Sequence, residues 1–262
     1  MQIVADTHIH FYPCYHLDFA LNTLTQNLKK LSPDAVKMAF FVERSDCHFF
    51  SELCKDEGRI LKSGFEISRG NQKDVIIILK QDEACLYLFP GRQIVTSERI
   101  EILSLTSDTN IEDGLPVDTV IKRILNAGGV PVISWAPGKW FFHRGKVIEK
   151  LIARMSSRQL LIGDTSLRPT LWKKPLLMQS TEKAGFKTLA GSDPLPFPGE
   201  EVHLGTYGSS IKGVFKSEEP VKSIRSLLTD PDIKIESIGR RNSSVEALRR
   251  LLKNARTKQR FD

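Results

Sequence analysis

The sequence predicts an α/β fold, a TIM-like barrel of mostly parallel strands in one domain that spans residues 1–262. The chain opens with a strand, a helix and a second strand, which is the pattern of a parallel β-α-β unit. Strands and helices alternate again from residue 116 to the end, as in barrels and open parallel sheets. Polar residues follow directly after several strands, and a parallel barrel builds its active site at those strand ends.

Apolar spacing defines the first unit. Residues 3–5 form a short apolar run that predicts the end of a buried strand. Leucines and alanines recur every three or four positions over residues 17–31 and predict an amphipathic helix, which the Ser-Pro-Asp sequence at 32–34 ends. Residues 36–42 are nearly all apolar, which is typical of a strand buried on both faces.

Residues 59–105 differ from the rest of the chain. They show no helical period, and short apolar runs alternate with polar turns such as Pro90-Gly91. This pattern predicts β-hairpins inserted between two barrel strands, followed by a return to the barrel. After residue 116 the predicted elements are helices at 118–126, 144–155, 176–184, 220–228 and 243–256, and strands at 130–134, 160–163 and 187–190.

Composition restricts the class of protein and its partners. No run of about 18 apolar residues is present, so we expect no membrane span. The start of the chain lacks a secretory pattern and the four cysteines are scattered, which together predict reduced thiols and a cytoplasmic protein. The net charge of +7 favours an anionic small-molecule substrate or a nucleic acid. Much of that charge lies in a basic C-terminal helix, residues 243–262, and the sequence leaves the oligomeric state open.

The first candidate site is a histidine pair. His8 and His10 follow the apolar run at 3–5, and alternation along a strand places both on one face. Two neutral imidazoles presented together suit a divalent metal. Asp6, two residues earlier, is expected to ligate the ion or to orient a histidine. The alternative is that both histidines make ordinary hydrogen bonds at a strand end.

Carboxylates and an arginine follow two other strands. Asp193 comes directly after the strand at 187–190 and is a candidate metal ligand or base, or else a turn cap. Glu43 and Arg44 follow the second strand. Arg44 is a candidate for holding a phosphate with two parallel hydrogen bonds, whereas the alternative is a surface ion pair with Glu43 or Asp46.

Three segments in this order resemble the PHP (polymerase and histidinol phosphatase) superfamily. They are Asp6-Thr7-His8-Ile9-His10, the segment from Ala127 to Ile133 with its Gly-Gly pair, and Leu189-Ala190-Gly191-Ser192-Asp193. Members of that family are distorted seven-stranded (β/α) barrels that bind two or three divalent ions. They hydrolyse phosphoesters with a metal-bound hydroxide. The resemblance spans residues 5 to 210 and implies the same barrel here.

The chain keeps only part of that family's ligand pattern. His8, His10 and Asp193 match, whereas the family's Asp-His pair is Glu43-Arg44 and its Gly-x-Glu is Gly91-Arg92-Gln93. A tryptophan and a leucine replace two further histidines. The resemblance therefore implies one ion, of Mn, Zn or Fe, held by His8, His10, Asp193 and Glu43.

Two hypotheses follow. The first is a divergent, PHP-like metal-dependent hydrolase acting on a phosphoester, in which Asp193 and Arg44 are catalytic and Lys139 or Arg144 helps to hold the substrate's negative charge. The second is a catalytically inactive barrel that binds an anionic partner such as RNA through the basic C-terminal helix.

Overall fold

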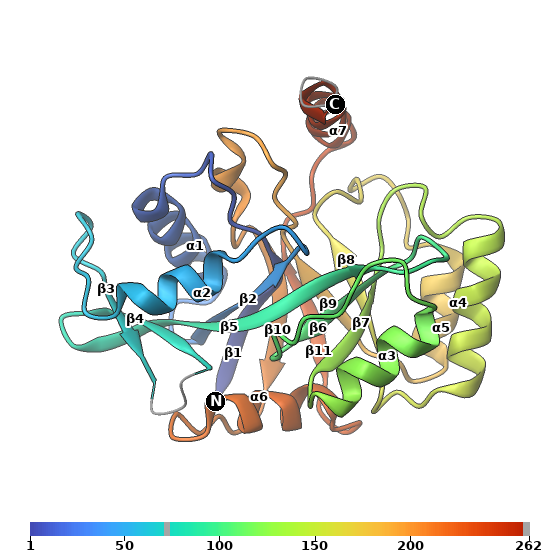
Figure 1. The fold of residues 1–262 in the computed structure, drawn as a ribbon, viewed down its shortest axis with the longest axis horizontal. Coiled ribbons are helices and arrows are strands. Elements are labelled where there is room, and N and C mark those ends of the chain that lie inside the picture. The colour runs from blue at the N-terminus through green and yellow to red at the C-terminus, as the bar shows by residue number, and fades with distance from the viewer. Residues whose placement is uncertain (71–73, 259–262) are drawn as a thin grey trace.

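The structure is a computed structural model that describes residues 1–70 and 74–258. One mixed sheet curls into a nearly closed barrel (Figure 1). Its strands, in spatial order, are β11 (Ile235–Gly239), β10 (Tyr207–Lys212), β1 (Gln2–Ile9), β2 (Val36–Glu43), β5 (Glu83–Val95), β6 (Glu101–Leu105), β7 (Val130–Ser134), β8 (Leu161–Thr165) and β9 (Thr188–Gly191). The α/β barrel expected from the sequence is confirmed.

The barrel mixes parallel and antiparallel neighbours. Strands β1, β2 and β5 are parallel to one another, as are β7, β8 and β9. Strand β6 runs antiparallel to both β5 and β7, and β10 runs antiparallel to β1 and β11. The first residue of β6 therefore lies at the same mouth of the barrel as the last residues of β5 and β7.

Side-chain contacts complete the ring between β9 and β1. Thr7 on β1 donates its hydroxyl to the carbonyl of Ala190 at 3.0 Å, and the hydroxyl of Ser209 on β10 accepts from the Ala190 amide at 2.8 Å. The Thr7 bond holds the N-terminal strand against β9, 183 residues later in the chain, and the Ser209 bond holds β10 against the same strand. The two candidate metal-binding segments are thereby neighbours.

The hairpin section at 59–105 is partly outside the barrel. Strands β3 (Glu66–Arg69) and β4 (Ile76–Lys80) lie off the main path, and β4 joins β5 through a tight turn in which Gln81 and Asp82 have positive φ. Strands β5 and β6, from the same section, belong to the barrel itself. The inserted part is thus confined to β3, β4 and the outer half of β5.

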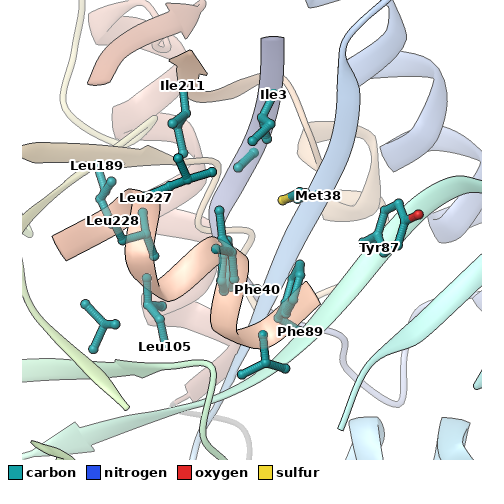
Figure 2. Packing of buried hydrophobic residues seen from close by; sticks show 14 of the residues in the cluster. Ile3, Met38, Phe40, Tyr87, Phe89, Leu105, Leu189, Ile211, Leu227 and Leu228 are labelled. Atoms are coloured by element: carbon teal, nitrogen blue, oxygen red, sulfur yellow. The ribbon is translucent and has the colours of Figure 1, made fainter. Parts of the chain in front are cut away.

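Alternation along the strands separates an inner from an outer core. Inward side chains such as Phe40, Phe89 and Leu105 meet at the barrel centre, where Leu227 and Leu228 of α6 (Pro220–Thr229) close the bottom (Figure 2). Burying each side chain of this size contributes about 1.5–3 kcal/mol. Because α6 fills the lower end with apolar side chains, polar groups gather at the opposite end.

Helices cover the outside of the barrel. Helix α1 (Leu17–Leu31) packs its leucines on the outer face of β1 and β2, as the sequence predicts. On the other side lie α3 (Val117–Asn126), α4 (His143–Arg154) and α5 (Leu176–Lys183) (Figure 1). Short helices occupy Phe49–Leu53 (α2), Cys54–Asp56 (η1) and Glu200–His203 (η2).

The basic C-terminal helix is present as α7 (Ser244–Lys258), and residues 259–262 of the expected segment lie outside the described residues. It lies above the upper mouth of the barrel (Figure 1). None of the helices within the described ranges is both long and apolar enough to cross a bilayer. The four cysteines are free thiols.

Candidate metal centre

His8, His10 and Asp193 meet at the upper mouth of the barrel. The Nε2 atoms of the two histidines are 3.0 Å apart, and Asp193 Oδ1 lies 3.4 Å from His8 Nε2 and 3.8 Å from His10 Nε2. Both imidazoles are buried, with His8 3% and His10 4% exposed. Among the described residues these three form the group of His, Cys and acidic side chains close enough to share an ion.

A change of register in β1 turns the histidines toward this point. The pairing of β1 with β2 shifts between Asp6 and Ile9, and Val4 and Ile9, five residues apart, both pack in the outer core. Strict alternation would put those two residues on opposite faces. A bulge of this kind re-aims side chains next to many active sites.

Asp6 therefore does not touch the histidine rings. Its Oδ1 accepts hydrogen bonds from the backbone amides of His8 (3.2 Å) and Ser192 (2.9 Å), and its Oδ2 accepts from the amide of Gly205 (2.9 Å). Complete burial raises the pKa of this carboxyl to about 6. Asp6 holds the backbone on both sides of the site, so the expectation that it ligates an ion or orients an imidazole is not met.

The residues fit a divalent ion. Atoms bound to one ion at about 2.0–2.2 Å are themselves roughly 3.0–3.6 Å apart, close to the separations seen here. Burial, with the nearby charges of His8 and Arg44, lowers the pKa of His10 well below its ordinary value, so its ring is the neutral, ligating form. Burial also raises the pKa of Asp193. A cation placed among these atoms would favour the ionised carboxylate.

Gln93 and Glu101 extend the site along β5 and β6. The Oε1 of Gln93 is 3.2 Å from His8 Nε2, and its amide nitrogen donates to Glu101 Oε1 at 3.4 Å. Lys139 pairs with the same Glu101 carboxylate. Glu101 was not among the residues predicted from the sequence. Alternation with the inward-pointing Leu103 and Leu105 could have indicated that Glu101 faces the barrel interior, but not at which mouth it lies.

Glu43 and Arg44, at the end of β2, make contacts in different places. Glu43 Oε1 accepts from the amide of Phe50 at 2.8 Å, at the start of α2, and the structure does not bring it into the group of three. Arg44 lines the pocket over the site and also pairs with the exposed Asp46, with Nε 3.3 Å from Oδ1. The sequence-based expectation that Glu43 reaches the ion thus has no support in this geometry.

A pocket of about 220 Å³ opens beside the candidate metal centre, with His10 and Asp193 in its lining. Arg44 and Lys139 contribute positive charge to its wall, and Tyr12, Leu251 and Asn254 line it as well. The Oδ1 atom of Asn254 is buried and has no hydrogen-bond partner among the described residues. An orphaned buried acceptor is costly, so a ligand with a hydrogen-bond donor would gain from meeting it.

Arg144, predicted from the sequence to help hold the substrate's charge, is not part of the pocket lining, and neither is His203. Arg144 donates to the carbonyl of Gly138 at 2.7 Å. His203 lies beside Glu200, at 3.8 Å. Neither belongs to the group of possible metal ligands.

With its nearly closed mixed sheet and a histidine-aspartate group at the mouth, the protein has the fold of a PHP-like barrel. Two solved structures are similar to it. PsfC from Pseudomonas syringae PB-5123 matches with a TM-score of 0.59 and 13% identity, over 100% of this chain and 99% of that one. The novel lesion-specific endonuclease PfuEndoQ from Pyrococcus furiosus matches with a TM-score of 0.52 and 12% identity, over 90% of this chain and 58% of that one. No protein-family model and no curated protein matches the sequence.

Proposed function

We propose that the protein is a metal-dependent hydrolase of phosphoesters that uses one divalent ion, held by His8, His10 and Asp193. The observation that supports this most directly is the convergence of two buried Nε2 atoms and a carboxylate oxygen beside a pocket that His10 and Asp193 line. Two histidines and a carboxylate leave positions open on the ion for water and substrate. Bound there, the ion would supply a water of lowered pKa and a Lewis acid for the phosphoryl oxygen.

The side chains around the ion have separable tasks. Arg44 offers a planar guanidinium that can hold two oxygens of a phosphoryl group. Lys139 adds a second positive charge, and its partner Glu101 keeps the ammonium at the pocket wall. Asp193 lines the pocket, and its carboxylate has a second oxygen that can accept a proton from a water bound there while Oδ1 serves as the ligand. We therefore assign Asp193 both a ligand and a catalytic role.

The pocket size limits the substrate. A cavity of about 220 Å³ fits the phosphate end and a few further atoms of a small molecule. We propose an anionic small molecule with a phosphoester as the substrate class. Imidazole suits Zn and Fe, and carboxylate suits Mn, so the mixed ligand set is compatible with all three metals.

Metal analysis of the purified protein tests this proposal. We expect about one equivalent of Mn, Zn or Fe per chain, either co-purified or loaded at micromolar concentration, and metal-dependent release of nitrophenol from nitrophenyl phosphate or bis-nitrophenyl phosphate. His8→Ala and His10→Ala should abolish both. His16→Ala is the matched control, because His16 is exposed and outside the group. A protein that binds no metal at micromolar concentration, or that keeps its metal in both variants, would contradict the proposal.

A second candidate function, binding of a nucleic acid by a barrel without catalysis, draws on α7. Arg249 and Arg256 are exposed on this helix and seven residues apart, so they lie on one face. If they contact RNA phosphates, affinity for generic RNA should fall steeply with salt, and the doubly substituted Arg249→Gln, Arg256→Gln protein should show a shallower slope. Absent or salt-insensitive binding would remove this candidate.

A further inference from the structure

Arg250 reaches from α7 to the backbone of Asp193 in the metal centre. It is 4% exposed and forms a buried ion pair with Glu200, whose two oxygens lie 2.9 and 3.1 Å from Arg250 Nε; the nearer one also accepts from an Nη atom at 2.6 Å. Its remaining donors go elsewhere. One Nη donates to the hydroxyl of Ser166 at 3.1 Å, and the other donates to the backbone carbonyl of Asp193 at 3.3 Å.

Ser166 links Arg250 to the residue before Asp193. Its hydroxyl accepts from Arg250 and donates to the carbonyl of Ser192 at 2.5 Å. Arg250 thus holds the carbonyl of Asp193 directly and that of Ser192 through one hydroxyl. The amide of Asp193 is bound in turn to the carbonyl of His8 at 2.9 Å.

These bonds fix a backbone conformation that aspartate adopts at a cost. Asp193 has φ +49°, in the left-handed region, which costs a residue with a Cβ atom free energy, although aspartate tolerates it better than most residues do. The peptide planes on its two sides are the ones held by His8, Ser166 and Arg250. Since φ and ψ describe the rotation between those planes, holding both planes sets the direction of the Cα–Cβ bond of Asp193.

We propose that Arg250 is a positioning residue of the metal centre: it keeps Asp193 in the left-handed conformation that aims its carboxylate at His8 and His10. Helix α7 then contributes to the metal centre through Arg250. It also contributes Leu251 and Asn254 to the wall of the pocket. The expected effect of Arg250 on metal affinity rests on the proposed function. Its effect on the conformation of Asp193 rests on the backbone geometry alone.

Metal affinity measured by calorimetry gives the first test, with Mn²⁺ as the probe. Arg250→Lys keeps a positive charge beside Glu200 but lacks the planar fork needed to serve Glu200, Ser166 and Asp193 together. We expect its affinity for Mn²⁺ to fall about 10- to 100-fold, the range for partners of metal ligands. Ser166→Ala, which leaves the ion pair intact, should weaken binding in the same direction and by less.

Lys253→Met is the matched control. Lys253 also fastens α7 to the body of the protein, through the carbonyl of Pro198 and the ring of Phe197, but it does not touch Asp193. Its affinity for Mn²⁺ should stay within about twofold of the parent protein. Equal losses in Arg250→Lys and Lys253→Met would overturn the inference, because generic loosening of the helix would then explain both.

Hydrogen exchange in metal-free protein gives the second test. In Arg250→Lys the backbone amide of Asp193 should exchange at least about tenfold faster, while amides of α3 stay unchanged. Unchanged exchange at Asp193 would also overturn the inference, whatever the metal does. If the parent protein binds no metal but exchange at Asp193 still responds, the proposed function fails and the positioning role of Arg250 stands.

Discussion

Gly191 lies against His8 so closely that no side chain fits between them. A Cβ atom built on Gly191 would be 2.4 Å from the Cβ of His8 and 2.6 Å from its backbone nitrogen. The contact joins β9 to β1, and it brings Asp193, two residues after the glycine, beside the imidazoles. Closure of the barrel and assembly of the metal centre therefore both require a glycine at position 191.

Gly191→Ala is accordingly expected to damage both. The added methyl must push β9 away from β1, because the nearest atoms are backbone or the root of a side chain, and overpacking of this kind costs about 1–3 kcal/mol. Urea denaturation should show that loss, and calorimetry should show weaker Mn²⁺ binding. Gly163→Ala is the control, since its nearest contacts are at 3.2–3.5 Å and lie away from the histidines. Equal effects of the two substitutions would contradict this account of Gly191.

The buried pair of Asp164 and Arg168 is expected to stabilise the fold and to have no part in catalysis. Two hydrogen bonds of 2.6 and 2.7 Å join the side chains, which are at most 4% exposed, and Tyr207 donates to the same carboxylate at 2.8 Å. Arg168→Met would leave a buried carboxylate without its cation, at a cost of about 3–5 kcal/mol in the free energy of unfolding. Chemical denaturation measures this loss.

The exposed pair of Lys222 and Glu219 supplies the comparison for that measurement. Lys222→Met should change the free energy of unfolding by less than about 1 kcal/mol, because solvent screens the pair. If Arg168→Met cost no more than this control, the buried pair would have no stabilising role.

Glu43 is expected to make stability depend on pH. Burial raises the pKa of its carboxyl from 4.5 to about 7, against smaller opposing contributions from the Phe50 amide and Arg92. The folded state then binds a proton more tightly than the unfolded chain does, so the free energy of unfolding decreases as pH rises from 4.5 to about 7 and levels off above. Glu43→Gln keeps an acceptor for Phe50 and should remove a decrease on the order of 3 kcal/mol.

Urea denaturation of both proteins between about pH 4.5 and 8 checks this expectation, with the difference between the two curves as the quantity of interest. Mn²⁺ affinity should be the same in both, since Glu43 lies outside the histidine-aspartate group. Parallel pH curves would contradict the pKa argument, and a loss of affinity would restore Glu43 as a ligand.

Some residues of the candidate site could be predicted from the sequence, and others could not. His8, His10 and Asp193 could be predicted because each follows a recognisable apolar strand, and parallel strands end at one mouth. Glu101 was missed because β6 runs antiparallel, so its first residue and not its last reaches that mouth. The direction of a strand within a sheet is a long-range property that its own residues do not record.

Two other residues show what local patterns omit. Asp6 was placed with the histidines on strict alternation, whereas the register shift after it breaks that alternation. Arg250 looked like one more charge on a basic helix. Its role depends on Glu200, 50 residues earlier, and on the backbone of Asp193, which no spacing rule connects to it.

Gln93 offers a test of whether the ion sits where the ligands converge. Its Oε1, 3.2 Å from His8 Nε2, is a neutral oxygen at the rim of the proposed site. Gln93→Glu replaces it with a charged one, and affinity for divalent ions rises with the charge of the ligand set. We expect Mn²⁺ to bind about tenfold more tightly, as measured by calorimetry.

The same substitution should have the opposite effect on the metal-free protein. Gln93 now donates to Glu101 at 3.4 Å, and Gln93→Glu would place two carboxylates there, only partly offset by Lys139. The metal-free melting temperature should therefore fall, and the rise on adding Mn²⁺ should exceed that of the parent protein. Gln159→Glu, an exposed position far along the chain beside Ser156, controls for the added charge. If Gln93→Glu leaves Mn²⁺ affinity unchanged while destabilising the metal-free protein, the ion does not lie among His8, His10 and Asp193, because a carboxylate this close to His8 Nε2 must change the binding of any cation held there.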